Sequence, residues 1–460
     1  MEHIEHISFG TDGWRATLDT FTEPRVRIVG QAIADYIGTG TVAVGYDARE
    51  SSRGFADAVS EVLADNGIDV LISERDCPTP VLAWTLGERS LDGGIMITAS
   101  HNPPDYNGVK FLPPDGAPAL PVVTDELTER LAEPTALPES DQGEIHEDTF
   151  TTAYGQHALE FVDPALDLDG QQIAYDAMHG SGRGVTDALL EEAGADVDCL
   201  RCEQDAAFGG VPPEPSADRL ETLTERVQEG NAAFGIANDG DADRIAVVTP
   251  GRGYLDPNLY FAVLYEYLLE STAESGPAIR TVSTTFLIDR IAAAYGERVI
   301  ETPVGFKWVA QAMDEHDAII GGEESGGFGL TAHLRNKDGV LLALLTAAAH
   351  AEQPLDERAD AIVEEYGDIH QDRVSVACSD ERKEEVLAAL EGVLPENVAN
   401  VPVEEIGTKD GFKIRLEDGS WLLVRPSGTE PKLRVYAEAN SDERVEELLV
   451  AGRDLIEPLV

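Results

Sequence analysis

The sequence is poor in lysine and in positive charge generally. Only seven of its 33 basic residues are lysines, whereas aspartate and glutamate together number 87, and the formal net charge is −54. A chain of this charge repels nucleic acid and anionic membrane surfaces, so neither is expected as a partner. The acidic residues are spread along the whole chain, which excludes a single acidic tail. This composition is typical of adaptation to high salt, with an ordinary acidic cytoplasmic enzyme as the alternative.

Long apolar runs and cysteines are also scarce. No run approaches the roughly 20 apolar residues of a membrane span. The N-terminus has no basic region followed by an apolar core, so we expect no signal peptide and a cytoplasmic protein. Among the four cysteines, Cys199 and Cys202 have the spacing of half a zinc site, but no second pair follows. We interpret them as apolar side chains on and after a strand at 197–200, and we expect no disulfide.

Length and patterning predict several domains. A chain of 460 residues is too long for one ordinary core, and 42% hydrophobic residues indicate a globular protein. Strands alternating with helices favour mostly parallel sheets covered by helices. We therefore predict three tandem α/β domains with mixed, mostly parallel sheets, followed by a C-terminal α+β domain. The expected ranges are 1–152, 153–254, 255–368 and 369–460.

Apolar periodicity places the main elements. Strands are predicted in the first three domains at 42–45, 68–72, 95–97, 173–176, 197–200, 281–285 and 299–302. Helices are predicted there at 185–193 and 287–294, and the stretch 133–147 is interpreted as a helix end and connection. In the last domain we predict strands at 374–378, 412–416, 421–424 and 433–437, with helices at 381–394 and 442–455.

The stretch from Gly94 to Lys110 is organised around a serine. A short apolar run ends at Thr98-Ala-Ser-His-Asn102, and the two prolines that follow exclude a helix enclosing Ser100. Asn107-Gly108 then predicts another turn. Ser100 is therefore expected on a stiff loop after a strand, flanked by His101 and Lys110, although many such serines are only turn residues.

Three carboxylates alternate in Asn238-Asp-Gly-Asp-Ala-Asp-Arg244, between two apolar runs. Such carboxylates repel one another unless a cation lies among them, and hard oxygen ligands suit Mg²⁺ or Ca²⁺. An EF-hand is excluded, because its sixth position would be Arg244 rather than Gly and its twelfth Pro250 rather than Glu. A solvated acidic cluster is the alternative.

Two further loops contain groups suited to a sugar phosphate. Gly321-Gly-Glu-Glu-Ser-Gly-Gly327 presents Glu323 and Ser325, which can bind vicinal sugar hydroxyls, although glycine-rich loops are often only turns. Arg425-Pro-Ser-Gly-Thr-Glu-Pro-Lys-Leu-Arg434 follows a strand. Its guanidinium groups, hydroxyls and backbone N–H groups can form an anion cradle, with a surface turn as the alternative.

These loops together resemble those of the alpha-D-phosphohexomutases, the phosphoglucomutase and phosphomannomutase family. Thr98-Ala-Ser-His-Asn-Pro103 resembles the phosphoserine loop, and the three other loops resemble the metal-binding, sugar-recognition and phosphate-binding loops in the expected order. Gly10-Thr-Asp-Gly-Trp-Arg15, Thr302-Pro-Val-Gly-Phe-Lys-Trp308 and His333-Leu-Arg-Asn-Lys-Asp-Gly339 also match. The resemblance covers the chain from end to end. One departure is Gly327, where many phosphomannomutases have His.

The resemblance implies reversible phosphoryl transfer between C1 and C6 of a hexose phosphate in a central cleft. Phosphorylated Ser100 would donate its phosphoryl group, and a hexose 1,6-bisphosphate would be both intermediate and activator. The implied Mg²⁺ ligands are Ser100, Asp239, Asp241 and Asp243. The implied catalytic residues are Ser100, His101, Arg15, Lys110 and Lys337, the two lysines being candidates for acid and base. The implied substrate contacts are Arg244, Gly305, Lys307, Glu323, Ser325, Arg425, Ser427, Gly428, Thr429 and Arg434.

The sequence also bears on the substrate. Phosphoglucosamine mutases usually have Gln where this chain has Glu324, and the segments 302–308 and 333–339 are more similar to phosphoglucomutases. We therefore expect glucose 1-phosphate to be preferred, mannose 1-phosphate to be accepted and glucosamine 1-phosphate to be poor, with phosphomannomutase and phosphoglucosamine mutase as alternatives. Two other classes remain: a phosphatase with Asp239 as nucleophile, and a non-catalytic sugar-phosphate sensor. The pattern specifies no oligomeric state.

Overall fold

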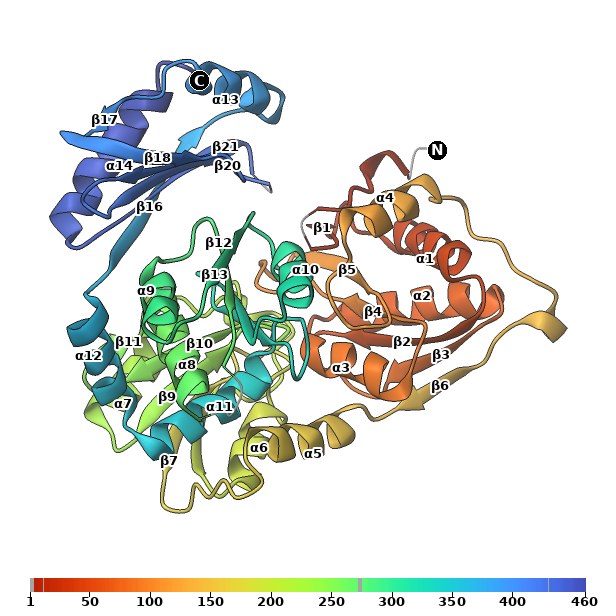
Figure 1. Ribbon diagram of the computed structural model, residues 1–460. Coiled ribbons are helices and arrows are strands. Elements are labelled where there is room, and N and C mark those ends of the chain that lie inside the picture. The colour runs from red at the N-terminus through yellow and green to blue at the C-terminus, as the bar shows by residue number, and fades with distance from the viewer. Residues whose placement is uncertain (1–3, 11, 272–274, 429) are drawn as a thin grey trace.

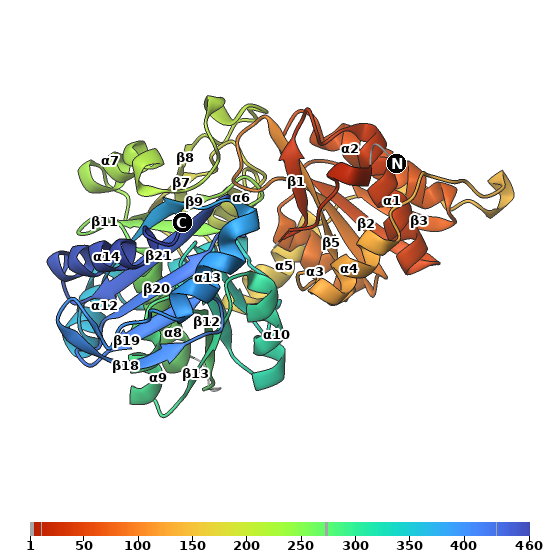
Figure 2. The same ribbon diagram turned by 90° about the horizontal axis from the view of Figure 1, so that it is seen from above.

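The computed structural model describes residues 4–10, 12–271, 275–428 and 430–460. These residues form four β-sheets, each built from one continuous part of the chain. Figure 1 shows the first part on one side of the molecule and the C-terminal part above the third, and Figure 2 shows the same arrangement from above. No helix among the described residues is long and apolar enough to cross a membrane.

The first sheet has the strand order β1-β5-β4-β2-β3-β6 and is parallel except at β5, which runs antiparallel to both neighbours. Its strands are β1 (Trp14–Thr17), β2 (Gly40–Tyr46), β3 (Ile68–Ser73), β4 (Gly93–Ile97), β5 (Tyr106–Leu112) and β6 (Ile145–Asp148). Its helices are α1 (Glu23–Ile37), α2 (Ser52–Asp65), α3 (Thr79–Arg89) and α4 (Pro121–Glu129). Helices α2 and α3 both contact β2 and cover opposite faces of the sheet (Figure 1).

The second and third sheets repeat this plan of a parallel centre extended by antiparallel strands. The second, in the order β11-β10-β9-β7-β8, contains β7 (Gln172–Asp176), β8 (Asp196–Leu200), β9 (Phe234–Asn238), β10 (Ile245–Thr249) and β11 (Gly253–Tyr254), with α5 (Thr151–Val162), α6 (Thr186–Glu192) and α7 (Glu221–Glu229). The third, in the order β13-β12-β14-β15, contains β12 (Ala278–Thr281), β13 (Val299–Thr302), β14 (Ile320–Glu323) and β15 (Gly327–Leu330). Its helices are α8 (Pro257–Ser271), α9 (Leu287–Ala294), α10 (Phe306–His316), α11 (Gly339–Glu352) and α12 (Leu355–Tyr366).

The fourth sheet is antiparallel throughout, in the order β16-β21-β20-β19-β18-β17. Its strands are β16 (His370–Ala377), β17 (Asn397–Val398), β18 (Val401–Gly407), β19 (Phe412–Leu416), β20 (Trp421–Pro426) and β21 (Lys432–Ala439). Helices α13 (Lys383–Glu391) and α14 (Asp442–Ile456) complete this part. The predicted fold class, three α/β domains and a C-terminal α+β domain, is confirmed.

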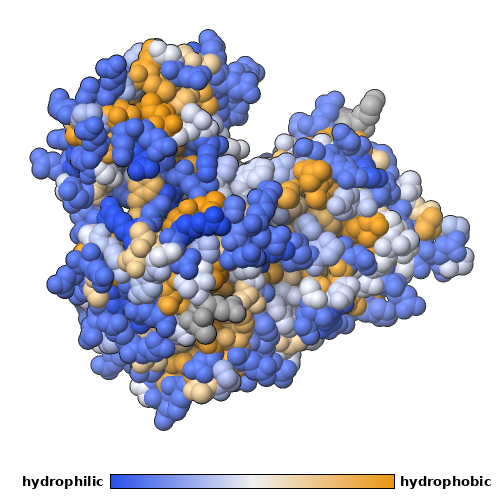
Figure 3. Space-filling model, viewed as in Figure 1, coloured by the Kyte–Doolittle hydropathy of each residue, from blue (hydrophilic) through white to orange (hydrophobic). Residues whose placement is uncertain are grey.

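The cores explain how the parts are joined. One apolar cluster runs through the first three parts and includes Leu82, Tyr175, Phe261 and Leu341, whereas the C-terminal part has its own core. Helix α11 is buried along most of its length, as expected of an apolar helix between packed elements. Figure 3 shows a notch between the C-terminal part and the first part, at the upper edge of the molecule. We propose that this notch is the opening of the central cleft that the sequence predicts.

Each sheet draws its strands from one of the four residue ranges predicted above. We propose these ranges, divided after residues 152, 254 and 368, as the domains of the protein. They are called domains 1 to 4 below.

Three local predictions are wrong. Asn107-Gly108 does not turn the chain but lies within β5. The glycine is needed there for close packing instead, since a Cβ at Gly108 would lie 2.5 Å from the carbonyl oxygen of Thr98. The stretch 133–147 contains the start of β6, an edge strand with few apolar residues. The strand predicted at 281–285 ends at Thr281, because the Thr281 hydroxyl bonds the Ser283 and Thr284 hydroxyls and stabilises a turn.

Candidate active site

The four loops singled out in the sequence occupy equivalent places in their sheets. The Ser100 loop connects β4 to β5, and the acidic loop connects β9 to β10. The glycine-rich loop connects β14 to β15, and the Arg425 loop connects β20 to β21. Each pair of strands is antiparallel and hydrogen-bonded, so every loop is a short connection held at both ends by a sheet. Short connections of this kind place side chains with little freedom.

A buried arginine holds the Ser100 loop. The guanidinium of Arg49 donates to the carbonyl oxygens of Ser100 at 2.9 Å and Asn102 at 2.8 Å, and it pairs with the buried Asp47. Thr98 completes the arrangement, because its hydroxyl donates to Asp47 and accepts the backbone N–H of Ser100. Ser100 itself has a φ of 50°, an uncommon conformation for a residue other than glycine. Such backbone strain persists only where the surroundings enforce it, as these hydrogen bonds do.

The acidic loop lies against Ser100. The Ser100 hydroxyl donates to Oδ2 of Asp239 at 2.8 Å, and both side chains are completely buried. The backbones also approach closely, since a Cβ at Gly240 would lie 2.6 Å from the Ser100 carbonyl oxygen. Asp241 is fixed by Thr79, whose hydroxyl donates to its carboxylate at 2.6 Å. Domains 1 and 2 thus form one site around the serine.

The three aspartates of this loop fit a divalent cation. One carboxylate oxygen from each of Asp239, Asp241 and Asp243 lies within 4.8 Å of the others. Oδ1 of Asp241 and Oδ1 of Asp243 are buried and lack a hydrogen-bond partner, which is costly for a carboxylate oxygen. Burial, followed by the charges of Asp243 and Asp241, raises the pKa of Asp239 well above its usual value. A cation bound by these oxygens would satisfy the free atoms and relieve the repulsion, so the triad could hold a metal.

Two lysines lie beside the triad. Nζ of Lys110 is 3.0 Å from a carboxylate oxygen of Asp241 and 3.2 Å from one of Asp243, while Nζ of Lys337 is 2.7 Å from the same Asp243 oxygen. Asp12 lies 3.0 Å from the Lys110 ammonium. Burial opposes the charged form of Lys110, but Asp12, Asp241 and Asp243 outweigh it and raise the pKa of the ammonium. The structure therefore brings together both lysines that the sequence singled out.

Positive charge also surrounds His101. Its Nδ1 lies 3.3 Å from the Ser100 hydroxyl oxygen. The charge of Arg244, then burial, then the charge of Arg15 lower the pKa of His101 well below its usual value, which favours a neutral ring at neutral pH. Nε of Arg244 is buried without a hydrogen bond and lies 3.9 Å from Oδ1 of Asp243, while Arg15 donates to Asp12 at 2.7 Å and to Asn102 at 3.4 Å. These groups form a local positive field in a strongly negative protein.

Domain 3 contributes the sugar-recognition candidates. Glu323 is buried at the end of β14, and one of its oxygens accepts the backbone N–H of Gly305 at 2.9 Å. Burial raises the pKa of Glu323, and the nearby Lys337 charge opposes that rise. Lys307 is half-buried, whereas Ser325 is exposed. Glu323 and Gly305 therefore lie together beside Lys337, with Ser325 open to solvent.

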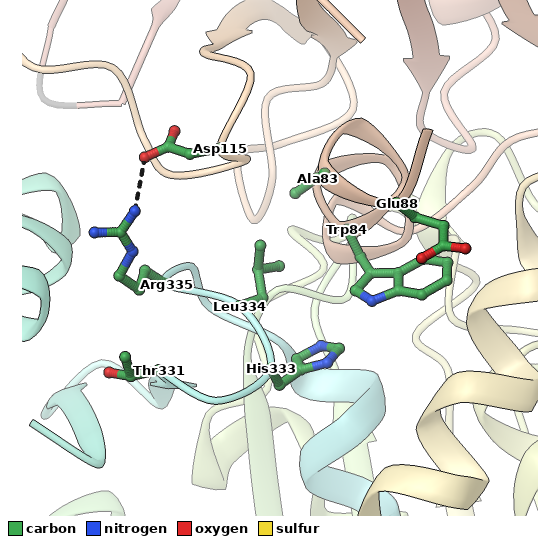
Figure 4. Close-up of a pocket in the computed structure, with 9 residues that line it drawn as sticks. Ala83, Trp84, Glu88, Asp115, Thr331, His333, Leu334 and Arg335 are labelled. Atoms are coloured by element: carbon green, nitrogen blue, oxygen red, sulfur yellow. Dashed lines mark hydrogen bonds and ion pairs between the residues drawn. The ribbon is translucent and has the colours of Figure 1, made fainter. Parts of the chain in front are cut away.

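The segment before Lys337 is held against domain 1. Arg335 pairs with Asp115 at 3.0 Å, and the side chain of Asn336 donates to the carbonyl oxygen of Gly116 at 2.9 Å. Figure 4 shows the Arg335–Asp115 contact across a cavity of about 270 Å³ that also has Trp84 and His333 in its wall. The cavity lies outside the group of residues around Ser100. What this region contributes to the site is the pair of contacts between domains 1 and 3, Arg335 with Asp115 and Asn336 with Gly116, which fix the position of the Lys337 segment.

The Arg425 loop belongs to domain 4, on the other side of the cleft. Arg425 donates to Asp410 at 2.8 Å, and Asp410 also accepts the backbone N–H of Val304, which connects this loop with domain 3. Arg434 pairs with Glu430 at 2.9 Å. The Ser427 hydroxyl is buried without a partner. Of the remaining predicted contacts, Gly428 is exposed and Thr429 lies outside the described residues.

Some residues of the site escaped the sequence reasoning. Arg49 follows Tyr46-Asp-Ala at the end of a predicted strand, a position that could have marked it, but nothing in the sequence shows that it reaches the Ser100 loop. Asp12 stands within the Gly10–Arg15 motif, so attention to that motif's carboxylate would have found it. Thr79 carries no local signal, because its contact with Asp241 spans two domains.

Comparison with known proteins decides the family. Models of the phosphoglucomutase/phosphomannomutase family match the chain in order: alpha/beta/alpha domain I at 6–137, domain II at 152–253, domain III at 256–366 and the C-terminal domain at 374–455. The chain belongs to the phosphoglucomutase/phosphomannomutase family. It is an enzyme, an isomerase that acts by phosphoryl transfer, as phosphohexomutases are.

Individual phosphohexomutases are similar over their whole length. A protein of Methanopyrus kandleri named as a phosphoglucosamine mutase is 36% identical over 96% of this chain and 95% of its own. A phosphoglucomutase/phosphomannomutase of Thermococcus kodakarensis is 32% identical over 90% of each chain. A crystal structure named as a phosphomannomutase from Thermus thermophilus superposes with a TM-score of 0.86 at 32% identity, covering 98% of this chain and 99% of that one. These names cover several sugars, so they leave the preferred substrate open.

Proposed function

We propose that this phosphohexomutase interconverts hexose 1-phosphate and hexose 6-phosphate through a phosphoserine at Ser100, with glucose 1-phosphate as the preferred substrate. One observation carries the proposal: the Ser100 hydroxyl bonds Asp239 within a buried triad of carboxylates, beside two lysines and the ring of His101. A serine that only formed a turn would need none of these groups. Mg²⁺ is the proposed cofactor, and a hexose 1,6-bisphosphate is the proposed intermediate and activator.

The chemical step exchanges one ester bond for another. The bond between phosphorus and Oγ of Ser100 breaks as a sugar hydroxyl oxygen bonds to phosphorus; the hydroxyl loses its proton to a base, and Oγ takes a proton from an acid. We assign these proton transfers to Lys110 and Lys337, which exchange roles when the reaction reverses. His101 orients Ser100, and Arg15 and Arg244 stabilise the transferring phosphoryl group. When bound by Ser100 and the three aspartates, Mg²⁺ would offset the negative charge of the phosphoserine.

The opposite wall of the cleft would bind the sugar and its second phosphate. Arg425, Ser427, Gly428, Thr429 and Arg434 are the proposed contacts of the phosphate that does not react. The unpartnered Ser427 hydroxyl supports this, because a buried donor needs an acceptor. Glu323 and Ser325 would bind sugar hydroxyls, with Gly305 and Lys307 beside them. For the second half of the reaction the bisphosphate must reverse its orientation in the cleft, so that its other phosphate is placed next to Ser100.

The alternatives from other classes fit less well. As nucleophile of a phosphatase, Asp239 would need a free carboxylate oxygen, but one of its oxygens accepts the Ser100 hydroxyl and the other the backbone N–H of Arg244. A sugar-phosphate sensor would need no buried triad and no strained serine. Both features support catalysis at Ser100.

Replacing the nucleophile tests the mechanism. Ser100→Ala should lower mutase turnover at least about a thousandfold, whereas the lost hydrogen bond to Asp239 should lower the free energy of unfolding by only about 1–3 kcal/mol. Mass spectrometry of the purified native protein should find phosphate on Ser100. Ser140→Ala, at an exposed serine of domain 1, is the matched control and should be fully active. Near-normal turnover by Ser100→Ala would overturn the phosphoserine mechanism.

Substrate preference needs its own test because a second candidate exists. Phosphoglucosamine mutase activity is favoured by the name of the Methanopyrus relative and by the adjacent carboxylates of Glu323 and Glu324, which would attract a protonated amine. Against it, the hydroxyl oxygens of Thr281 and Thr284 lie 3.3 and 3.2 Å from the Glu324 carboxylate, which turns it toward β12. kcat/KM should be measured at high salt with a bisphosphate primer for glucose, mannose and glucosamine 1-phosphates. Glucose 1-phosphate should be best; a higher value for glucosamine 1-phosphate would overturn the preference and leave the Ser100 mechanism standing.

A further inference from the structure

A second group of metal-binding side chains lies in domain 2, apart from the acidic loop. It consists of Asp187 in the first turn of α6, Cys199 on the edge strand β8 and Cys202 just after that strand. One ligand atom of each lies within 4.8 Å of the others. The sequence showed only the two cysteines, because Asp187 is brought to them by the packing of α6 on β8.

The backbone between the cysteines is held in place. Arg201 has a φ of 50°, which turns the chain between Cys199 and Cys202. Its guanidinium bonds the carboxylate of Asp176 and the carbonyl oxygen of Arg219. The hydrogen bonds of the Arg201 side chain therefore fix this turn, and the turn needs no bond between the two thiols. All four cysteines are free thiols in the structure.

One distance and one buried oxygen without a hydrogen-bond partner fit a tetrahedral metal ion. Zinc–sulfur and zinc–oxygen bonds of about 2.3 and 2.1 Å at a tetrahedral angle separate sulfur and oxygen by about 3.6 Å. Sγ of Cys199 lies 3.6 Å from Oδ2 of Asp187. The other oxygen of Asp187 is buried and has no hydrogen-bond partner. Cys199 is exposed, so an ion can enter and water can take the fourth position.

The donor set selects the metal. Two thiolates and one carboxylate suit a borderline-soft ion such as Zn²⁺, whereas the all-oxygen triad suits Mg²⁺. We propose that Asp187, Cys199 and Cys202 form a zinc site that ties α6 to the edge strand β8. Binding displaces the protons of both thiols, so it strengthens as pH rises toward neutrality and above. The ion is structural rather than catalytic, because its three ligands lie on α6 and at the edge strand β8 and none of them belongs to the group around Ser100.

The full-length reduced protein, freed of bound metal and supplied with excess Mg²⁺, is titrated with Co²⁺ and then with Zn²⁺. We expect one equivalent of Co²⁺ to give the intense thiolate-to-cobalt charge-transfer absorption, and Zn²⁺ to displace it. The double variant Cys199→Ser/Cys202→Ser should lose this absorption, and Asp187→Asn should weaken Zn²⁺ binding at least tenfold. Asp196→Asn, at an exposed carboxylate of the same strand, is the matched control and should bind like the wild type.

Thermal unfolding gives an independent readout. A ligand that binds only the folded state raises the melting midpoint, so Zn²⁺ should stabilise the wild type and the Asp196 control but not the double cysteine variant. The proposal is overturned if the wild type gives no thiolate-to-cobalt absorption, or if the double variant binds Zn²⁺ as tightly as the wild type. A Cys199–Cys202 disulfide in protein purified without oxidant would overturn it equally.

Discussion

A Cβ atom on Gly327 would lie 2.4 Å from Cδ of Lys337, so the lysine occupies the space that any other side chain at this position would need. The same lysine reaches Asp243 at 2.7 Å. Gly327 is the position where the sequence departs from the histidine of many phosphomannomutases. The absence of a side chain there is what allows Lys337 its place beside the acidic triad.

Adding a single methyl group should therefore impair catalysis more than folding. In Gly327→Ala the flexible Lys337 side chain, rather than the backbone, is the part that must move, and its ammonium leaves Asp243. We expect kcat/KM to fall at least tenfold while the free energy of unfolding changes by less than about 2 kcal/mol. Gly54→Ala is the control, because Gly54 is an exposed helical glycine with no atom within 4 Å of an added Cβ. Gly54→Ala should keep full activity, and its free energy of unfolding should rise by up to about 1 kcal/mol. Equal activity of both variants would contradict the assignment of Lys337.

The free oxygens of Asp241 and Asp243 predict a dependence on divalent cations. Exhaustive chelation should abolish turnover, and Mg²⁺ should restore it. Asp241→Asn removes one negative charge and exchanges a carboxylate ligand for a weaker amide oxygen, so the Mg²⁺ concentration for half-maximal activity should rise at least tenfold. Asp454→Asn, on the exposed face of α14, should leave that concentration unchanged. Full activity after chelation would refute the metal assignment.

The sequence predicted those helices and strands that are specified by periodic apolar residues within one short segment. The helix at 287–294 and the strands at 299–302 and 412–416 coincide with α9, β13 and β19, because periodic apolar residues specify them directly. Strands such as β6, at a sheet edge, and β18, next to one, were missed because hydrogen bonding to neighbours, rather than apolar side chains, defines them. The Asn107-Gly108 signal was misleading, since glycine serves close backbone approach as well as turns.

The candidate site was predictable only loop by loop. Each loop carries its own chemistry, so Ser100 and the three aspartates could be named from spacing. Their meeting could not, because the hydrogen bond from Ser100 to Asp239 joins residues 139 positions apart. The same limit applies to Asp187, which no cysteine spacing reveals. Which residues of different domains contact one another depends on how the domains pack together, and the spacing of residues in a single sequence does not reveal that packing.

A buried lysine at the junction of domains 3 and 4 predicts a pH dependence of stability. Nζ of Lys413 lies 3.0 Å from the Glu301 carboxylate and 4.2 and 4.3 Å from the ring centres of Phe286 and Trp421. Burial, and then the charge of Arg280, lower the pKa of Lys413 to about 8. In the unfolded chain the pKa is about 10.4. Between these values the unfolded state binds a proton that the folded state lacks, so the free energy of unfolding rises with pH.

This rise should disappear when the amine is removed. From pH 8 to pH 10.4 the contribution of Lys413 amounts to roughly 3 kcal/mol. Lys413→Met keeps an apolar chain against both rings but cannot titrate, so the difference in unfolding free energy between wild type and variant should change with pH across this window. Lys409→Met, at an exposed lysine nearby, should follow the wild-type profile. Parallel pH profiles for wild type and Lys413→Met would contradict the prediction.

The net charge of −54 predicts a strong dependence of stability on salt. Hydrophilic residues cover most of the face shown in Figure 3, so much of this charge lies where dissolved ions can screen it. The Debye length falls from about 10 Å at 0.1 M to about 3 Å at 1 M salt, which removes most of the self-repulsion between exposed carboxylates. The melting midpoint should therefore rise steeply between low and molar KCl, and NaCl of equal ionic strength should act similarly. Sucrose stabilises by exclusion without screening, so it should give a smaller rise. A midpoint that stays flat from low to high KCl would show that the acidic surface is not an adaptation to salt.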